Sequence, residues 1–217
     1  MAKLRIGVCV SGRGSNLQAL IDACGRPDFP AEIVLVVSNV AGVQGLERAE
    51  KAGIDTVTIE HGEFDSRQAF ESAVTHALED AGTELVCLAG FMRILSPEFC
   101  DRWSGRLLNI HPSLLPAFKG LDVQQMAIDA GVRFSGCTVH FVTPEMDAGP
   151  IIIQAVVPIL ADDTADALAA RILEQEHRIY PEAVRMFAEK RLTIDDRCVV
   201  VADAPRLDSS LVNPPPK

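Results

Sequence analysis

An asparagine and a histidine two residues apart are the first side chains whose types and spacing suit chemistry. Asn109 and His111 flank Ile110 at the end of an apolar run, and a proline-containing loop follows. Alternate side chains of an extended segment project to the same side, so the amide and the imidazole are expected to share one small space. The pair suits stabilisation of an oxyanion and movement of a proton. On this spacing alone, a strand end with a capping asparagine and a surface histidine remains an alternative.

A glycine-rich turn, Ser11-Gly12-Arg13-Gly14-Ser15-Asn16, separates an apolar run from an amphipathic segment that starts at Leu17. This order predicts an anion site, because glycines let the backbone approach a ligand and the free N–H groups of a helix start favour negative charge. Leu17 stands where a dinucleotide fingerprint has its third glycine, and no Gly-Lys-Ser/Thr pattern is present. The turn therefore fits a monophosphate, assisted by Ser15 and Asn16, with a plain tight turn as the alternative.

Three charged residues could complete a site. Arg67 falls in the first turn of a helix expected to begin at Asp65, where a cation is electrostatically disfavoured unless it serves a ligand anion. Glu176 lies at the edge of a buried helical stripe, where a carboxylate needs a partner. Asp147 lies in a turn-rich connection. Simple turn formation at Asp147 and solvent exposure at Arg67 are the plain alternatives.

The segment at residues 91–95 reads Phe-Met-Arg-Ile-Leu and follows the apolar run 84–90. An apolar, partly aromatic segment at a strand tip could form the wall of a pocket for a flat ligand. It could equally belong to the hydrophobic core, and composition alone slightly favours the core.

The scaffold for these candidates follows from the hydrophobic pattern. Apolar runs alternate with helical patterns up to residue 110, which predicts an α/β fold with a doubly wound, mainly parallel sheet. Two long runs, 134–142 and 151–159, are joined by a short turn-rich connection and predict antiparallel C-terminal strands. We expect a single domain over residues 1–203 and a disordered tail at 204–217.

The last helical pattern begins near Asp163 and contains Pro181, which is expected to kink the helix or restart it. Residues 193–201 are expected to form one final edge strand.

Composition excludes some classes of function. The net charge of −10 and the pI of about 4.9 disfavour general nucleic-acid binding, because an acidic surface repels phosphate backbones. No apolar stretch reaches the roughly 18 residues of a membrane span, so no membrane association is expected. The six cysteines show no C-x-x-C and no zinc-type spacing, which predicts reduced thiols, no metal and a cytoplasmic protein.

Four separate stretches together resemble the glycinamide ribonucleotide formyltransferase family. They are Ser11 to Gln18, Ala89 to Leu95, Asn109 to Pro116 and Asp147 to Pro150. The resemblance runs from about residue 4 to 192. The stretch from Asn109 marks the wider group of enzymes that use 10-formyltetrahydrofolate, and the glycine-rich turn narrows it to this family.

The resemblance implies a Rossmann-like formyltransferase fold and direct formyl transfer from 10-formyltetrahydrofolate, as co-substrate, to the amine of glycinamide ribonucleotide. The matched catalytic residues are Asn109, His111 and Asp147. The matched ribonucleotide contacts are Gly14, Ser15, Asn16, Arg67, Met92, Asn109, Pro112 and Glu176. The matched folate contacts are Met92, Arg93, Ile94, Leu95, Thr143, Pro144, Glu145, Met146 and Asp147. The partners implied are these two small molecules, with the chain a monomer or a homodimer.

The chain departs from the family pattern at several positions. Val123 and Gln124 stand where a Thr-His pair is common, Lys119 stands where a proline is common, and Pro144 replaces a frequent acidic residue. These departures affect detail of the folate site rather than the catalytic residues.

Three other functions compete with the transferase. Formyltetrahydrofolate deformylase would use the same three residues with water as acceptor, but its relatives usually carry an N-terminal regulatory domain, and this sequence starts at the first expected strand. Methionyl-tRNA formyltransferase would need a C-terminal tRNA-binding domain and a basic surface. A ligand sensor without activity would not need the intact catalytic residues.

Overall fold

A computed structural model describes residues 2–205 and 210–213 of the 217-residue chain. Its elements follow one another in the order β1 (Leu4–Val10), α1 (Ser15–Cys24), β2 (Ala31–Ser38), α2 (Gln44–Lys51), β3 (Thr56–Thr58), η1 (His61–Glu63), α3 (Arg67–Asp80), β4 (Leu85–Leu88), α4 (Pro97–Arg102), β5 (Leu107–His111), α5 (Val123–Asp129), β6 (Phe134–Phe141), β7 (Ile151–Pro158), α6 (Ala165–Ala188), β8 (Leu192–Asp195) and β9 (Cys198–Val201).

The strands in the described part of the chain form one sheet in the order β3-β2-β1-β4-β5-β6-β7-β9-β8. Five strands that are neighbours in the sheet, β3, β2, β1, β4 and β5, are parallel to one another. Strand β6 is antiparallel to both β5 and β7. The predicted doubly wound, mainly parallel sheet with antiparallel C-terminal strands is therefore confirmed. The chain switches sides at β1, which lies between β2 and β4, and open α/β sheets bind ligands at such a switch point.

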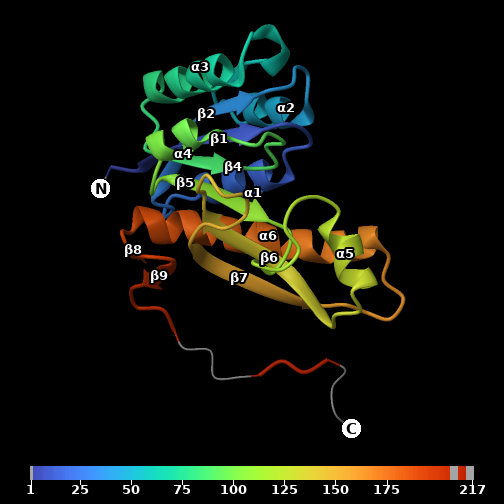
Figure 1. Cartoon of the computed structure of the whole chain (residues 1–217). Helices are drawn as coiled ribbons and strands as arrows, with labels where there is room; N and C mark the ends of the chain where they lie inside the picture. The colour runs from blue at the N-terminus through green and yellow to red at the C-terminus, as the bar shows by residue number, and fades with distance from the viewer. Residues whose placement is uncertain (1, 206–209, 214–217) are drawn as a thin grey trace.

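Helices cover both faces of this sheet, which explains why β1 reads as a continuous apolar run rather than an alternating one (Figure 1). On one face, buried side chains of α1 and α6 such as Leu17, Leu20 and Ile172 pack against the strands. On the other face, Phe70 of α3 and Phe99 of α4 belong to a second buried cluster. The loops that carry the candidate residues lie at the ends of strands held by these two layers.

Three local predictions need correction. Helix α3 is capped by Ser66, whose hydroxyl accepts from the N–H of Ala69, and not by Asp65. Helix α6 continues through Pro181 without a restart, because buried residues on both sides of the proline hold the helix against the sheet. Residues 193–201 do not form one strand. They form most of the antiparallel pair β8 and β9, which turns at Asp196 with a positive φ of 53°.

The predicted tail lies partly outside the described residues, since 206–209 and 214–217 are not among them. The described part is not helix or strand, but Asn213 is attached to the body of the protein. Its side-chain amide donates to the carbonyls of Arg133 and Ile159, at 2.7 and 3.2 Å. Disorder over the whole of 204–217 stays a prediction.

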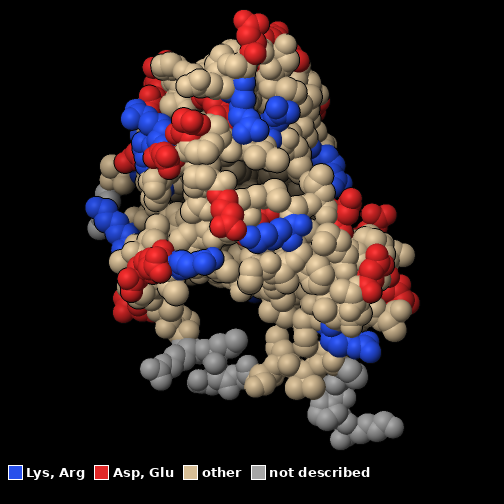
Figure 2. All heavy atoms as spheres, viewed as in Figure 1, with Lys and Arg blue, Asp and Glu red and all other residues tan. Residues whose placement is uncertain are grey.

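The surface mixes both signs of charge. Figure 2 shows lysine and arginine side chains interspersed with aspartate and glutamate over the face viewed, around a hollow near its middle. None of the helices among the described residues combines the length and the apolar character that crossing a membrane requires.

Candidate active site

The centre of the candidate site is the end of β5, where Asn109 and His111 occupy alternate positions as predicted. Strand β6 runs antiparallel beside it and places His140 directly opposite Asn109. The side-chain amide nitrogen of Asn109 lies 3.3 Å from Nε2 of His140. The centre of the site is thus formed by the amide of Asn109 and the imidazoles of His111 and His140, on the adjacent strands β5 and β6.

His140 is the residue that the sequence analysis missed. Its Nδ1 lies 2.9 Å from the carbonyl oxygen of Phe141 and must donate to it, which leaves the lone pair of Nε2 to accept from Asn109. Burial lowers the pKa of His140 below its usual value, which agrees with a neutral ring. His140 therefore orients the amide of Asn109 and leaves that amide a second N–H for a ligand.

His111 lies between two acceptors. Its Nε2 is 2.9 Å from the carbonyl oxygen of Phe118, and its Nδ1 is 3.6 Å from the nearer carboxylate oxygen of Asp147. Both side chains are largely buried, with His111 6% and Asp147 10% exposed. Nε2 can therefore donate to the Phe118 carbonyl, while Nδ1 faces the Asp147 carboxylate just beyond hydrogen-bond distance.

The loop after β6 brings Asp147 to this position. Gly149 permits the close return of the loop, because a Cβ there would lie 1.8 Å from the carbonyl oxygen of Phe141. Asp147 itself has a positive φ of 50°, and its carboxylate accepts from the N–H of Gly120 at 3.0 Å. The prediction that Asp147 joins Asn109 and His111 thus has geometric support.

Side chains of β6 and β7 hold the loop at residues 113–122. Thr138 of β6 donates to the carbonyl of Ser113 at 2.7 Å and accepts from the N–H of Leu115 at 3.1 Å. Gln154 of β7 also donates to the carbonyl of Leu115, at 3.0 Å. These contacts fix the loop whose Phe118 carbonyl faces His111.

The glycine-rich turn lies between β1 and α1. Gly14 is the N-cap of α1 with φ 67°, a conformation that suits glycine. No side chain caps this end of α1, so the N–H groups of its first turn remain available to a ligand. Ser11 ties the turn to its neighbours, since its hydroxyl donates to Asn39 at 2.5 Å and accepts from the N–H of Met92 at 2.8 Å.

Asn16 and Glu176 form a buried pair across α1 and α6. The amide nitrogen of Asn16 donates to the carboxylate of Glu176 at 2.6 Å, and the two residues are 8% and 7% exposed. Burial raises the pKa of Glu176, and the hydrogen bond from Asn16 opposes that shift. The predicted partner for this carboxylate is therefore found. The side-chain oxygen of Asn16 is buried without a hydrogen-bond partner among the described residues.

Arg67 is the predicted contact that the structure does not join to the others. It is exposed at the first residue of α3, and its guanidinium makes no hydrogen bond or ion pair within the described residues. Pro112 follows His111 directly and is half-buried.

The segment at 91–95 has both exposed and buried side chains. Met92 and Ile94 are 68% and 67% exposed, as a pocket wall would be. Phe91 and Leu95 are buried in the cluster that contains Phe99, so they belong to the core. Arg93 is exposed.

The loop at 143–147 supplies a third exposed apolar side chain, Met146, at 52% exposure. The hydroxyl of Thr143 donates to the carbonyl of Glu145 at 3.3 Å, and Pro144 is exposed. The carboxylate of Glu145 lies 3.6 Å from the ammonium of Lys119, so this ion pair spans the two loops around Asp147. Within the described residues, no group of three or more potential ligands could hold a metal ion.

Comparison with known proteins identifies the fold and the motifs. The sequence pattern of the family described as formyl transferase matches residues 4–184. The chain belongs to the formyl transferase family. Formyl transferases in this comparison include the phosphoribosylglycinamide formyltransferase of Escherichia coli (strain K12), which is 48% identical over 193 residues, covering 89% of this chain and 91% of that protein.

Other relatives agree. Glycinamide ribonucleotide transformylase 1 from Symbiobacterium toebii has a crystal structure with a TM-score of 0.91 and 50% identity, covering 93% of this chain and 95% of that one. The trifunctional purine biosynthetic protein adenosine-3 of Gallus gallus is 51% identical over 194 residues, or 89% of this chain. The chain spans only 19% of the length of that relative.

A formyltetrahydrofolate deformylase structure from Burkholderia mallei is also similar, with 32% identity and a TM-score of 0.84, covering 92% of this chain and 70% of that one. Its identity to this chain is lower than that of the two formyltransferases. The resemblance to the glycinamide ribonucleotide formyltransferases is thereby confirmed.

Proposed function

We propose that this formyl transferase moves the formyl group of 10-formyltetrahydrofolate to the amine of glycinamide ribonucleotide, a step of purine biosynthesis. The observation that carries the proposal is the position of His111 between the Phe118 carbonyl and the Asp147 carboxylate, beside the amide of Asn109. The similarity to phosphoribosylglycinamide formyltransferases supports the choice of substrates.

Asn109 would stabilise the charge that develops during transfer. The formyl donor supplies an activated carbonyl whose oxygen becomes negative when an amine adds to its carbon. Asn109 offers that oxygen the N–H that His140 does not use, in a geometry set before the substrates bind. One such donor typically contributes about 2.7–4 kcal/mol to the transition state.

His111 and Asp147 would stabilise the remaining charge on the oxyanion and accept the proton that the attacking amine loses. A doubly protonated His111 places positive charge beside the oxyanion, and Asp147 keeps that charge favourable. The amine must lose a proton as the new C–N bond forms, and N10 of the departing tetrahydrofolate must take up a proton as its bond to the formyl carbon breaks. The Asp147 carboxylate, held by the N–H of Gly120, is the nearest base to His111 through which that proton can leave.

The transfer is proposed to be direct, without an enzyme-bound formyl group. Cys137 of β6 is fully buried, and burial raises its pKa to about 12, so its thiol stays protonated. A protonated thiol is a poor nucleophile. The geometry instead supplies donors and a base for addition of one bound substrate to the other, followed by loss of tetrahydrofolate from the tetrahedral adduct.

Two different groups of residues would bind the two substrates. The open N–H groups at the start of α1 fit the ribonucleotide phosphate, with Gly14, Ser15 and Asn16 around it and Glu176 nearby. The exposed side chains of Met92, Ile94 and Met146 fit the flat ring system of a folate, because apolar surfaces and soft sulfur atoms pack well on aromatic faces.

A product assay tests this function. Purified protein is incubated with 10-formyltetrahydrofolate, with and without glycinamide ribonucleotide, and both formylated ribonucleotide and formate are quantified. The proposal predicts formylated ribonucleotide only when both substrates are present. Release of formate at the same rate without the ribonucleotide would establish the deformylase alternative and would refute the assignment of the glycine-rich turn.

Two further expectations stay predictions. A cytoplasmic location agrees with the six free cysteines. A monomer and a homodimer are both compatible with the site, whose proposed residues come from one chain.

A further inference from the structure

Helix α2 contacts the back of the glycine-rich turn, backbone against backbone. The N–H of Gly45 donates to the carbonyl oxygen of Gly12 at 3.0 Å. A Cβ on Gly14 would lie 2.7 Å from the Cα of Gly45, and a Cβ on Gly45 would lie 3.1 Å from the carbonyl oxygen of Gly12. Glycine at both positions therefore allows the helix to touch the turn.

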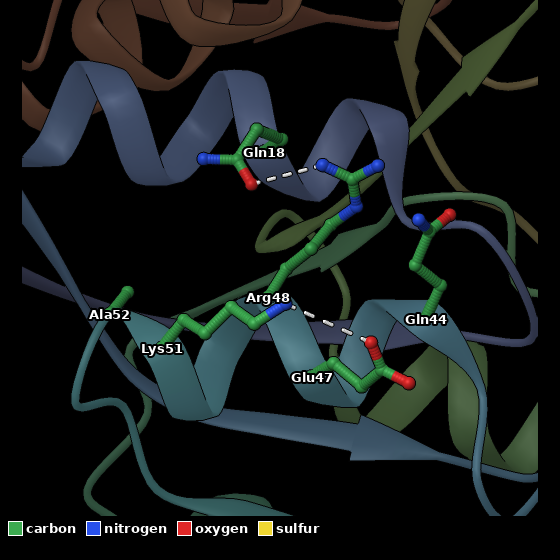
Figure 3. Close-up of a pocket in the computed structure, with 6 residues that line it drawn as sticks. All are labelled: Gln18, Gln44, Glu47, Arg48, Lys51 and Ala52. Carbon is green, nitrogen blue, oxygen red and sulfur yellow. Dashed lines mark hydrogen bonds and ion pairs between the residues drawn. The ribbon is translucent and has the colours of Figure 1, made fainter.

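Arg48 lies one turn further along α2 and reaches the same loop. Its Nε donates to the carbonyl oxygen of Arg13 at 2.9 Å, and its Nη1 donates to the side-chain oxygen of Gln18 at 3.1 Å. Figure 3 shows the guanidinium crossing from α2 to Gln18 on α1. The amide nitrogen of Gln18 donates to Asp22 at 2.8 Å, which turns its oxygen toward Arg48.

These contacts fix the direction of two consecutive peptide groups. In a planar trans peptide, the C=O and the following N–H point in opposite directions. Because the carbonyls of Gly12 and Arg13 are both held against α2, the N–H groups of Arg13 and Gly14 point away from it. Consecutive N–H groups that point the same way form an anion-binding concavity.

We propose that Arg48 is a positioning residue for binding of the ribonucleotide phosphate. It does not contact the phosphate but orients the Arg13–Gly14 peptide, whose N–H group does. The inference rests on the proposed function, because the glycine-rich turn must be the phosphate site. Arg48 bonds the far side of the peptide, so its contribution is to orient the N–H groups that contact the phosphate.

Lys51 provides a matched control on the same helix. Arg48 and Lys51 both line a hollow of about 360 Å³ beside the loop, together with Gln18, Gln44, Glu47 and Ala52 (Figure 3). Lys51 is 80% exposed, and its ion pair is with Glu47 at 3.9 Å on its own helix. Replacing Lys51 removes an equal charge from the hollow without changing a contact to the loop.

The test measures steady-state kinetics and calorimetric binding of both substrates for Arg48→Met and Lys51→Met. Methionine keeps a flexible stem but has no donor. We expect Arg48→Met to raise the KM and the Kd for glycinamide ribonucleotide about tenfold, as loss of a charged hydrogen bond does, with kcat and folate binding unchanged. Lys51→Met should stay within about twofold of wild type, because an exposed ion pair contributes little.

Ribonucleotide affinity within twofold of wild type in Arg48→Met, or an equal loss in Lys51→Met, would overturn the inference. Arg48→Lys keeps the charge but lacks the planar guanidinium that reaches two acceptors. The affinity of this variant for glycinamide ribonucleotide should therefore lie between the affinities of the wild type and of Arg48→Met. If Arg48→Met does not fold, Arg48→Lys decides, and wild-type affinity there would contradict the role.

The proposed function fails separately from this inference. Its failure would appear as wild-type protein that does not bind glycinamide ribonucleotide, or as Asn16→Ala binding it normally. Failure of the inference alone would leave Asn16→Ala impaired and Arg48→Met normal.

Discussion

The proposed ribonucleotide side and the proposed folate side of the candidate site differ in how firmly they are built. On the ribonucleotide side, Asn16 and Glu176 are more than nine-tenths buried and bonded to each other, and α2 holds the glycine-rich turn through Gly45 and Arg48. On the folate side, Met92, Ile94 and Met146 are more than half exposed. A preorganised anion cradle thus contrasts with an adaptable apolar surface.

The difference follows from what each ligand requires. A phosphate is recognised by directed N–H groups, whose geometry must be set before binding. A flat ring is recognised by apolar contact, which flexible methionines provide without fixed geometry. The proposed catalytic residues, on β5 and the loop after β6, are expected at the junction of the two sides.

The largest expected effect is at this junction. Asn109→Ala should lower kcat about 100- to 1000-fold, because it removes a donor aimed at the developing oxyanion. Single-turnover rates at saturating substrates measure it, and His140→Gln is the matched control, since a glutamine oxygen can still accept from the Asn109 amide. Near-native kcat in Asn109→Ala would place the oxyanion elsewhere.

The next prediction tests whether the two sides bind independently. Asn16→Ala should weaken glycinamide ribonucleotide binding about 10- to 100-fold, because Asn16 is a proposed contact of the ribonucleotide and because its hydrogen bond to Glu176, a second proposed contact, is also lost. Ser15→Ala should weaken it less, and Ile94→Ala should weaken folate binding instead. Separate calorimetric titrations of each ligand decide this. Equal loss of both ligands in Asn16→Ala would refute the division of the site.

Glu176 provides a pH test of the buried side. Its pKa is raised above the ordinary 4.5, so the folded protein holds this proton more tightly than the unfolded chain. Stability from this group is fully present below pH 4.5 and is lost as pH rises through the folded pKa.

Glu176→Gln has no such proton to lose. The Tm of the variant should therefore be close to that of the wild type near pH 4.5. At pH 8 the Tm of the variant should be higher than that of the wild type, by roughly 2–4 °C for each 1 kcal/mol that the buried charge of Glu176 costs the folded wild type. Melting curves of both proteins across this range provide the measurement. A difference in Tm that does not change with pH would show that Glu176 is not desolvated.

The smallest effect is expected on the exposed side. Lys119 and Glu145 are 32% and 76% exposed, so their ion pair should contribute under about 1 kcal/mol. Lys119→Met and Glu145→Gln should each change the KM for folate less than about threefold at low salt, and the double variant should show weak coupling. A loss that persists at 1 M salt would mean that the pair is shielded from solvent.

Local patterns in the sequence were enough for some parts of the site. The two-residue spacing of Asn109 and His111 predicted their shared side, because alternation is a property of any strand. The glycine-rich turn before α1 was likewise readable, since a strand, glycines and a helix start are consecutive in the chain. The alternation of strands and helices predicted the sheet.

Other parts depend on tertiary structure. His140 was missed because its place opposite Asn109 depends on the register between β5 and β6, which no local pattern gives. The sequence also did not predict that Leu95 is buried in the core and Ile94 is exposed, because residues 91–95 form neither a helix nor a strand with a regular alternation of buried and exposed positions. The support that Arg48 gives to the Arg13 carbonyl joins two elements distant in sequence.

The most direct test of the account is the kinetic and binding profile of Asp147→Asn. If Asp147 serves the reaction at the junction, kcat should fall at least 100-fold, while both substrates bind to the variant with affinities within about threefold of wild type. A variant with near-native kcat would contradict the role of Asp147. Loss of substrate binding in proportion to the loss of turnover would show that Asp147 belongs to a binding surface and not to the chemistry between the two.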